Sequence, residues 1–224
     1  HGDTQTDSHL ELPVVSSNRA RLDSLELIPF RSAIAEGVDA VMTAHVAMPE
    51  LLGPDAPPAT LSPEVMTALL RREMGFDGLL FTDALRMGAL TDEYGAGETA
   101  VLALEAGADV LLVPADVGET IEAVTAAVLE GRLTRARVDE SVRRILEAKA
   151  RQGLHRRAEV DLEAVDEIVG SGDHLAFADA VAAHSITLVR DHEELVPVLP
   201  DPDRRVLSLT LARPTDLVAP GKAE

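Results

Sequence analysis

Two groups of ionisable residues in this sequence have the types and spacing of catalytic side chains. Asp83 directly follows the apolar run 78–82 (GLLFT), and an acid at the end of a buried strand is costly unless it is used or paired. Asp7 and His9 flank a single serine in a polar segment. The carboxylate can therefore accept a hydrogen bond from the imidazole, fix its tautomer and raise its basicity.

A carboxylate and an oriented proton donor are the minimum for a retaining displacement at an acetal carbon. Asp83 would attack the anomeric carbon while His9 protonates the leaving oxygen, and His9 would then activate the water that releases the sugar. An imidazolium can replace the usual carboxylic acid because imidazole titrates close to neutral pH.

Each of these residues also has a structural interpretation. Asp83 would cap the following turn or bind a backbone amide, and the Asp7–His9 pair would belong to a surface turn. His45, which ends another apolar run, would be a buried structural histidine. A further alternative makes these four residues and His1 the ligands of a metal-dependent hydrolase, although their spacing matches no compact metal motif.

The order of the predicted elements shows what would position these residues. Apolar runs over residues 38–46, 78–82 and 108–114 predict strands. Between and after them, capping residues and helical spacing predict four helices. These helices begin at Ser62 with Pro63, near Glu98, at Asp116 and at Thr134, and the first three end at Gly75, Gly107 and Gly131.

Strands that are apolar on both faces and alternate with amphipathic helices predict an α/β fold with a parallel sheet. In such sheets the carboxyl ends of the strands form the active-site face, where His45 and Asp83 would lie. An eight-unit barrel needs about 250 residues, so residues 1–154 would hold about half of one. The alternative is an open, doubly wound sheet.

Composition narrows the class of protein. The 224 residues contain 39 acidic and 20 basic side chains, a net charge of −19, which argues against binding a nucleic acid backbone. No apolar run approaches the roughly 20 residues that cross a membrane. The chain has no cysteine, which removes thiolate catalysis and disulfides and assigns no compartment.

Five segments resemble, in order, the second half of the catalytic barrel of glycoside hydrolase family 3, in its β-N-acetylglucosaminidase (β-hexosaminidase) branch. They are HGDTQTDSHLELP, AVMTAHVAMPEL, PATLSPEVMTALLRREMGFDGLLFTDALRMGAL, AGADVLLVPAD and GRLTRARVDESVRRILEAKARQGL. Together they cover residues 1–154 almost without interruption. A sixth segment, AFADAVAAHSITLVRD, resembles the entry to the α/β sandwich domain that many members carry.

The resemblance implies roles for particular residues. Asp83, in the TDA motif, corresponds to the nucleophile, and His9 and Asp7, in the DSH loop, correspond to the acid/base and the residue that orients it. His1, Arg86 and Met87 would contact substrate, with packing as the alternative role for Met87. The family's Lys-His-Phe-Pro-Gly segment, which contacts the sugar, has no counterpart in these 224 residues.

The resemblance also implies the organisation of the chain. We expect the C-terminal half of a (β/α)8 barrel over residues 1–154, a linker over 155–175 and the beginning of an incomplete α/β sandwich domain over 176–224. Within that last part, residues 185–189 and 206–211 are predicted strands. A half barrel would depend on the missing N-terminal half, so we expect this chain alone to be inactive.

The expected activity is that of a glycosidase that removes terminal β-linked N-acetylglucosamine from glycans, including those of the cell wall, with no cofactor and no metal. Phosphorolysis within the same family is the alternative, because a histidine acid/base would not repel an incoming phosphate as a carboxylate does.

Overall fold

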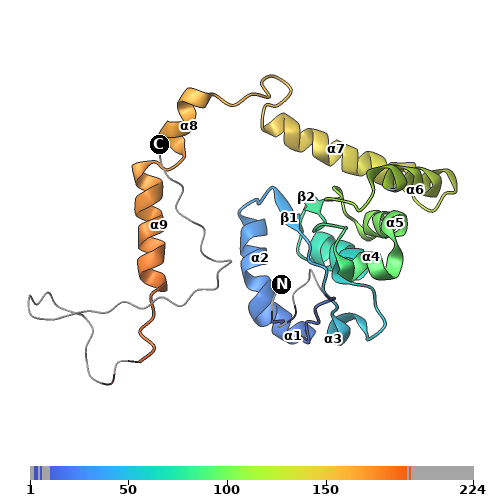
Figure 1. The fold of residues 1–224 in the computed structure, drawn as a ribbon, viewed down its shortest axis with the longest axis horizontal. Coiled ribbons are helices and arrows are strands. Elements are labelled where there is room, and N and C mark those ends of the chain that lie inside the picture. The colour runs from blue at the N-terminus through green and yellow to red at the C-terminus, as the bar shows by residue number, and fades with distance from the viewer. Residues whose placement is uncertain (1–2, 5, 7–10, 191, 193–224) are drawn as a thin grey trace, which may run out of the picture. The chain divides into compact units, whose positions relative to one another are not determined.

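The structure is a computed structural model that describes residues 3–4, 6, 11–190 and 192, apart from the side chains at positions 89, 91, 92 and 166. The chain divides into two compact units, His1–Glu159 and Val160–Glu224 (Figure 1), and each is described by itself. Asp83 and His45 belong to the first unit.

Two parallel strands form the centre of the first unit. β1 (Ala40–Met42) pairs with β2 (Leu79–Phe81), and Val41 lies opposite Leu80. This confirms the predicted parallel pairing. Both strands are shorter than the apolar runs that predicted them.

Isolated bridges extend the parallel arrangement on both sides. Phe81 pairs with Val110, and Val14 pairs with Ala47. The predicted strand over 108–114 is therefore reduced to a single bridge, because its backbone bonds diverge after Val110 to reach the residues that follow β2.

Helical segments connect and cover these strands (Figure 1). Before β2 they are α1 (Arg19–Arg21), the π-helical η1 (Leu22–Glu26), α2 (Leu27–Ala35), α3 (Pro49–Leu52), the 3₁₀ turn η2 (Ala59–Leu61) and the π-helical η3 (Glu64–Glu73). After β2 they are α4 (Gly88–Tyr94), α5 (Ala96–Ala106), α6 (Val117–Leu129) and α7 (Arg135–Arg151).

The predicted helix ends depend on recognisable caps. Asp116 Oδ1 accepts a hydrogen bond from Glu119 N at 2.8 Å at the start of α6, and Thr134 Oγ1 accepts one from Arg137 N at 3.1 Å at the start of α7. Gly107, at φ +129°, ends α5. These three predictions are confirmed, because side-chain acceptors and positive-φ glycines supply what a helix end lacks.

One face of the two strands packs against helices to form the main hydrophobic core. Leu80 has no exposed surface and packs with Met66 and Leu70 of η3 and Ala103 of α5. Met42, which points to the opposite face of β1, is 54% exposed. The prediction that both strand faces are covered therefore holds for only one face within the described residues.

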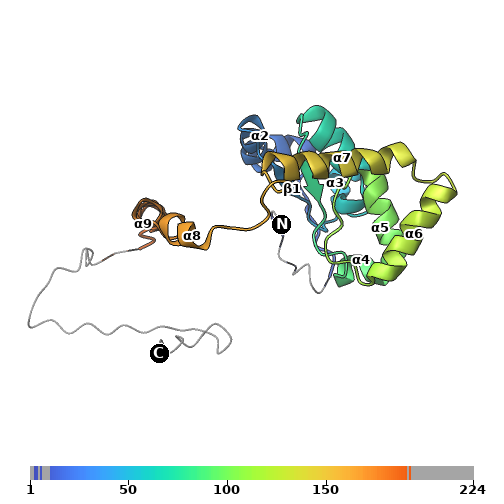
Figure 2. The ribbon, with the colours of Figure 1, turned by 90° about the horizontal axis from the view of Figure 1, so that it is seen from above.

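Helix α7 lies across the amino ends of the strands (Figures 1 and 2). Asp109, just before the bridge residue Val110, has a fully buried side chain that contacts three arginines. Arg71 comes from η3, whereas Arg137 and Arg144 come from α7. This buried ion cluster fastens α7 to the end of the sheet opposite Asp83.

The second unit contains α8 (Leu162–Ile168) and α9 (Gly172–Ser185). The predicted strand at 185–189 is wrong, since α9 continues through Ser185 and residues 186–190 form no strand. A strand needs a partner for its backbone ladder, and the structure describes none for this segment. The predicted strand at 206–211 lies outside the described residues.

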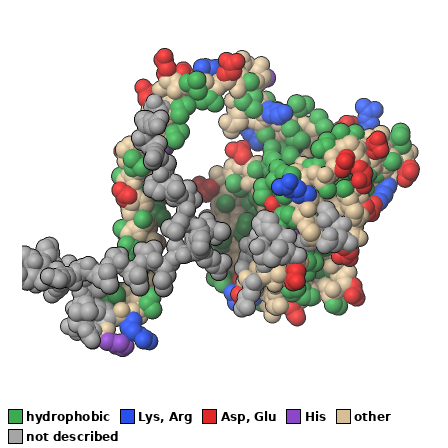
Figure 3. All heavy atoms as spheres, in the orientation of Figure 1, with side chains coloured by type: hydrophobic (Ala, Val, Ile, Leu, Met, Phe, Trp, Pro, Cys, Tyr) green, Lys and Arg blue, Asp and Glu red, His purple; other side chains and the backbone are tan. Residues whose placement is uncertain are grey.

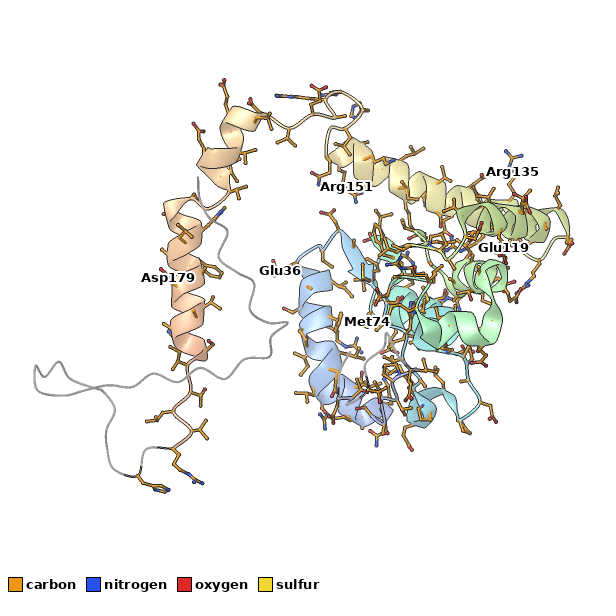
Figure 4. The ribbon with its side chains drawn as sticks, in the orientation of Figure 1. Glu36, Met74, Glu119, Arg135, Arg151 and Asp179 are labelled. Atoms are coloured by element: carbon orange, nitrogen blue, oxygen red, sulfur yellow. The ribbon has the colours of Figure 1, made fainter. Side chains whose placement is uncertain are left out.

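Charged side chains are distributed over the surface. The face of the first unit seen in Figure 3 carries acidic groups intermixed with apolar ones. One acidic residue, Glu119 of α6, labelled in Figure 4, accepts a hydrogen bond from Gly97 N of α5 at 3.2 Å.

No helix within the described ranges is both long enough and apolar enough to cross a membrane.

Candidate active site

Asp83 lies two residues beyond β2, on the side where the parallel strands have their carboxyl ends. It lines a cavity of about 400 Å³. Met42 and Thr43, at the end of β1, form one wall, and Glu26 and Phe30, from η1 and α2, form another. The carboxylate is therefore at the position where parallel α/β folds place their reacting groups.

Ala84 connects Asp83 to His45. The backbone N–H of Ala84 donates to Asp83 Oδ1 at 2.7 Å, so the prediction that Asp83 binds a backbone amide is confirmed. The Ala84 carbonyl oxygen lies 3.1 Å from His45 Nε2 and also accepts from Met87 N at 3.1 Å. Both lone pairs of this carbonyl are thus used, one inside a turn and one by the imidazole.

His45 is completely buried, and both of its ring nitrogens have partners. Nδ1 lies 2.8 Å from Thr60 Oγ1, which in turn lies 3.0 Å from Thr43 Oγ1 and 3.0 Å from the Ala44 carbonyl. Burial lowers the pKa of His45, and the bond to Ala84 and the charge of Asp83 raise it by less. The ring is therefore neutral at pH 7, as expected for a buried structural histidine.

The tautomer follows from the partners. A carbonyl oxygen only accepts, so Nε2 carries the proton and donates to Ala84, and Nδ1 accepts from the Thr60 hydroxyl. The Thr60 hydroxyl has a single proton, which is shared between His45 Nδ1 and the Ala44 carbonyl oxygen at 3.0 Å, and its oxygen accepts from Thr43 Oγ1.

The segment after Asp83 is also held from the other side. Leu85 N donates to Leu112 O at 2.9 Å, and Arg86 N donates to Val113 O at 3.1 Å. Val113 has φ +41°, a rare conformation for a β-branched residue that is retained only where neighbouring structure enforces it. Backbone strain is therefore stored next to the Asp83 turn.

The structure places three of the six predicted site residues. Asp83, Arg86 and Met87 lie on one short segment, where Arg86 is exposed and Met87 is 8% exposed. The burial of Met87 supports its packing role. His1, Asp7 and His9 lie outside the described residues, so the predicted pairing of Asp7 with His9 and their approach to Asp83 stay predictions.

The metal alternative stays a prediction, because His1, Asp7 and His9 lie outside the described residues. Where side chains are described, no three His, Cys, Asp or Glu groups are arranged to hold a metal ion. A cavity of about 450 Å³ lies near the amino ends of the strands. Its three arginines, Arg143, Arg144 and Arg151, each form an ion pair with a carboxylate, so its cations are already neutralised.

Sequence reasoning missed three residues around Asp83. Thr60 carries no motif and reaches His45 only through the turn η2. Val113 is unusual only in its backbone angle. Glu26 lines the Asp83 cavity from an unpredicted helix, and its Oε1 accepts from Arg21 Nε at 2.9 Å. Pro57 and Pro58, just before η2, are typical turn residues and are the sequence signal that could have indicated the turn carrying Thr60.

Comparison with known proteins assigns this arrangement to a class. Residues 1–148 match the model of the glycosyl hydrolase family 3 N-terminal domain. The chain belongs to glycosyl hydrolase family 3, whose N-terminal domain is an α/β fold of the TIM-barrel type. The matched range includes β1, β2 and Asp83.

Individual relatives agree with this assignment. The chain is 32% identical over 214 residues to a beta-N-acetylglucosaminidase/beta-glucosidase of Cellulomonas fimi, covering 92% of this chain and 38% of that protein. It is 45% identical, with a TM-score of 0.74, to the structure of a family 3 beta-N-acetylglucosaminidase from Paenibacillus sp. str. FPU-7, covering 87% of this chain and 37% of that one.

A third relative is named for a different activity. The structure of the beta-glucoside phosphorylase BglX is 30% identical, with a TM-score of 0.77, and the match covers 89% of this chain and 38% of that one. The chain thus spans well under half the length of each of these three relatives.

Proposed function

We propose that this protein is a retaining exo-glycosidase that removes terminal β-linked N-acetylglucosamine from glycans, including peptidoglycan fragments. The observation that carries the proposal is the position of Asp83 at the carboxyl end of β2, lining a cavity, in a chain of glycosyl hydrolase family 3. Relatives named as beta-N-acetylglucosaminidases support the choice of sugar.

In the first step a carboxylate oxygen of Asp83 attacks the anomeric carbon. The bond from that carbon to the leaving oxygen breaks, and its electron pair stays on the leaving oxygen, which takes a proton from His9. Asp7 orients the imidazole of His9. The result is a covalent glycosyl-aspartate with inverted configuration.

In the second step His9, now neutral, takes a proton from water. The water oxygen attacks the anomeric carbon, the ester bond to Asp83 breaks, and the carboxylate is restored. Two inversions give net retention of configuration. The hydrogen bond from Ala84 N keeps the Asp83 carboxylate in one orientation through both steps.

The proposed substrate contacts are fewer than a complete pocket needs. Arg86 is exposed close to Asp83 in the sequence. Together with His1, it would bind sugar hydroxyls. Met87 would pack beneath the substrate-binding residues. We assign residues 1–154 to the C-terminal half of the barrel, 155–175 to a linker and 176–224 to the start of a sandwich domain. In the described part of the chain Met42 of β1 is exposed, which supports the proposal that further barrel elements pack on this face.

Replacing the nucleophile tests the proposal. In the full-length protein, Asp83→Ala is expected to lower kcat for a chromogenic N-acetyl-β-glucosaminide by at least about 10³-fold, since no covalent intermediate forms. Asp77→Ala is the matched control, because Asp77 is an exposed aspartate at the amino end of the same strand. Full activity of Asp83→Ala would contradict the proposal.

Phosphorolysis is the second candidate, favoured by the similarity to a beta-glucoside phosphorylase. In this variant phosphate replaces water in the second step and the product is the sugar 1-phosphate. Product analysis with and without inorganic phosphate separates the two candidates. Free N-acetylglucosamine formed at the same rate in both conditions supports hydrolysis, and sugar 1-phosphate formed faster with phosphate supports phosphorolysis.

A further inference from the structure

His45 is buried behind the candidate nucleophile without belonging to the proposed chemistry. It has no exposed surface, so a substrate bound in the Asp83 cavity would not contact it. Burying a neutral imidazole costs the desolvation of two polar nitrogens, a cost that an apolar side chain of similar size would avoid. Its two hydrogen bonds therefore deserve a specific explanation.

The bond from Nε2 acts on the one residue that also binds the Asp83 carboxylate. Ala84 donates its N–H to Asp83 Oδ1 and accepts from His45 Nε2 through its carbonyl. Because the φ and ψ angles of Ala84 lie between these two groups, a fixed carbonyl also restricts the direction of the N–H. The imidazole thus constrains the carboxylate through one residue.

The hydrogen bond that Nδ1 accepts holds the imidazole itself in place. Thr60 belongs to η2 and has no exposed surface, and its hydroxyl lies 2.8 Å from Nδ1. Thr43, just after β1, contacts the same hydroxyl at 3.0 Å. The network therefore ties the end of β1 and the turn η2 to the residue after the nucleophile. Its central bond, between His45 and Thr60, is buried, so it is not exchanged for a bond to solvent.

We propose that His45 is a positioning residue: its Nε2–H holds the Ala84 carbonyl, and through Ala84 it holds the carboxylate of Asp83 in its attacking position. This inference rests on the proposed function, in which Asp83 is the nucleophile. Loss of the Nε2 donor lets the 83–84 segment move, and a displacement of about 1 Å costs a nucleophile up to about 100-fold in rate.

Two amide substitutions separate positioning from simple packing. The amide nitrogen of His45→Gln reaches the place of Nε2 and can still donate to Ala84. The shorter amide of His45→Asn reaches only the place of Nδ1, so the Ala84 carbonyl loses its donor. Both variants lose the aromatic ring, so they are matched in the cavity they create more closely than either is to the wild type.

The experiment measures kcat, KM and thermal unfolding of the full-length wild type and both variants. We expect His45→Asn to lower kcat about 10- to 100-fold with a much smaller change in KM, and His45→Gln to recover most of kcat. Equal kcat in two folded variants, or losses that only follow the loss of folded protein, would overturn the proposal.

Thr60 provides a second pair in case the histidine variants do not fold. Thr60→Val removes the hydroxyl with little change of volume, and Thr60→Ser keeps it. We expect Thr60→Val to lower kcat through a misplaced imidazole and Thr60→Ser to retain it. Wild-type kcat in Thr60→Val would count against the network.

A structural measurement keeps this inference distinct from the proposed function. An inactive wild type would contradict the function and leave the positioning role to be decided by crystallography. In a crystal structure of His45→Asn or Thr60→Val we expect the Asp83 carboxylate to shift and its bond to Ala84 N to lengthen or break. An unmoved carboxylate would overturn the role of His45 whatever the activity.

Discussion

The Asp83 carboxylate lies at the end of a chain of short hydrogen bonds whose members are far apart in the sequence. Ala84 is its neighbour, but His45 lies 39 positions from Ala84, and Thr60 lies 15 from His45. Sequence reasoning identified Asp83 and His45 because each ends an apolar run. It did not predict the hydrogen bond from His45 to the Ala84 carbonyl, because every residue has a backbone carbonyl and no residue type indicates which one is bound.

His45 also gives a prediction for stability against pH. Burial lowers its pKa below the ordinary value of 6.5, so below that pH the unfolded chain binds a proton that the folded chain resists. The unfolded state then binds more protons, and the free energy of unfolding falls as the pH falls. The contribution of neutral His45 to the free energy of unfolding is fully present above pH 6.5, and it is lost as the pH falls below that value.

The measurement compares urea unfolding of the full-length wild type and His45→Gln between about pH 7.5 and 5. Glutamine does not titrate, so the stability advantage of the wild type is expected to shrink as the pH is lowered. Other acid-sensitive groups act on both proteins and cancel in the difference. A difference that stays constant or grows on acidification would contradict the shifted pKa of His45.

At the scale of elements, α7 depends on Asp109. The fully buried carboxylate accepts from Ser141 Oγ at 2.7 Å, Arg144 Nη1 at 3.1 Å and Leu80 N at 3.1 Å, and it forms an ion pair with Arg71. Burial lowers the pKa of Arg71, and Asp109 raises it by less. Removing the carboxylate would take away the ion-pair partner of the Arg71 guanidinium, whereas Arg144 and Arg137 would keep their pairs with Glu140.

Asp109→Asn is therefore expected to lower the free energy of unfolding by about 3–5 kcal/mol, because breaking a buried pair strands the opposite charges. Glu147→Gln is the control. Its pair with Arg143, at 3.0 Å, is more than half exposed on both sides, and exposed pairs contribute about 0–1 kcal/mol. Denaturant unfolding of both variants checks the prediction, and a similar small loss in each would contradict it.

The helices that the sequence predicted correctly are those with a capping residue at the start or a glycine at the end. Asp116, Thr134 and Gly107 mark ends of α6, α7 and α5 because their side chains or backbone angles satisfy the helix termini. The helical segment from α1 through α2 was missed. It contains Pro29, which has no N–H to donate within a helix, and a π-helical stretch that shifts the apolar spacing.

At the scale of the whole molecule, the parallel α/β class follows from sequence because buried parallel strands are apolar and alternate with helices. The strand lengths do not follow, because they depend on neighbouring strands. The exposed Met42 illustrates this point, since its side chain is apolar but is not covered by any described element. The approach of His9 and Asp7 to Asp83 depends on contacts between segments far apart in the sequence, which local patterns do not encode.

The account centres on Asp83 as the residue that becomes glycosylated, and covalent trapping tests this most directly. In a 5-fluoro N-acetylglucosaminyl fluoride the ring fluorine slows both steps by destabilising their transition states. The reactive anomeric fluoride, a good leaving group, speeds only the first step, so the glycosyl-enzyme forms faster than it is hydrolysed. The full-length protein is incubated with this reagent, digested and sequenced by mass spectrometry.

The predicted result is one fluorinated sugar on Asp83, and none on the peptide from Asp83→Ala. A sugar on another residue, or hydrolysis that continues in Asp83→Ala, would contradict the account.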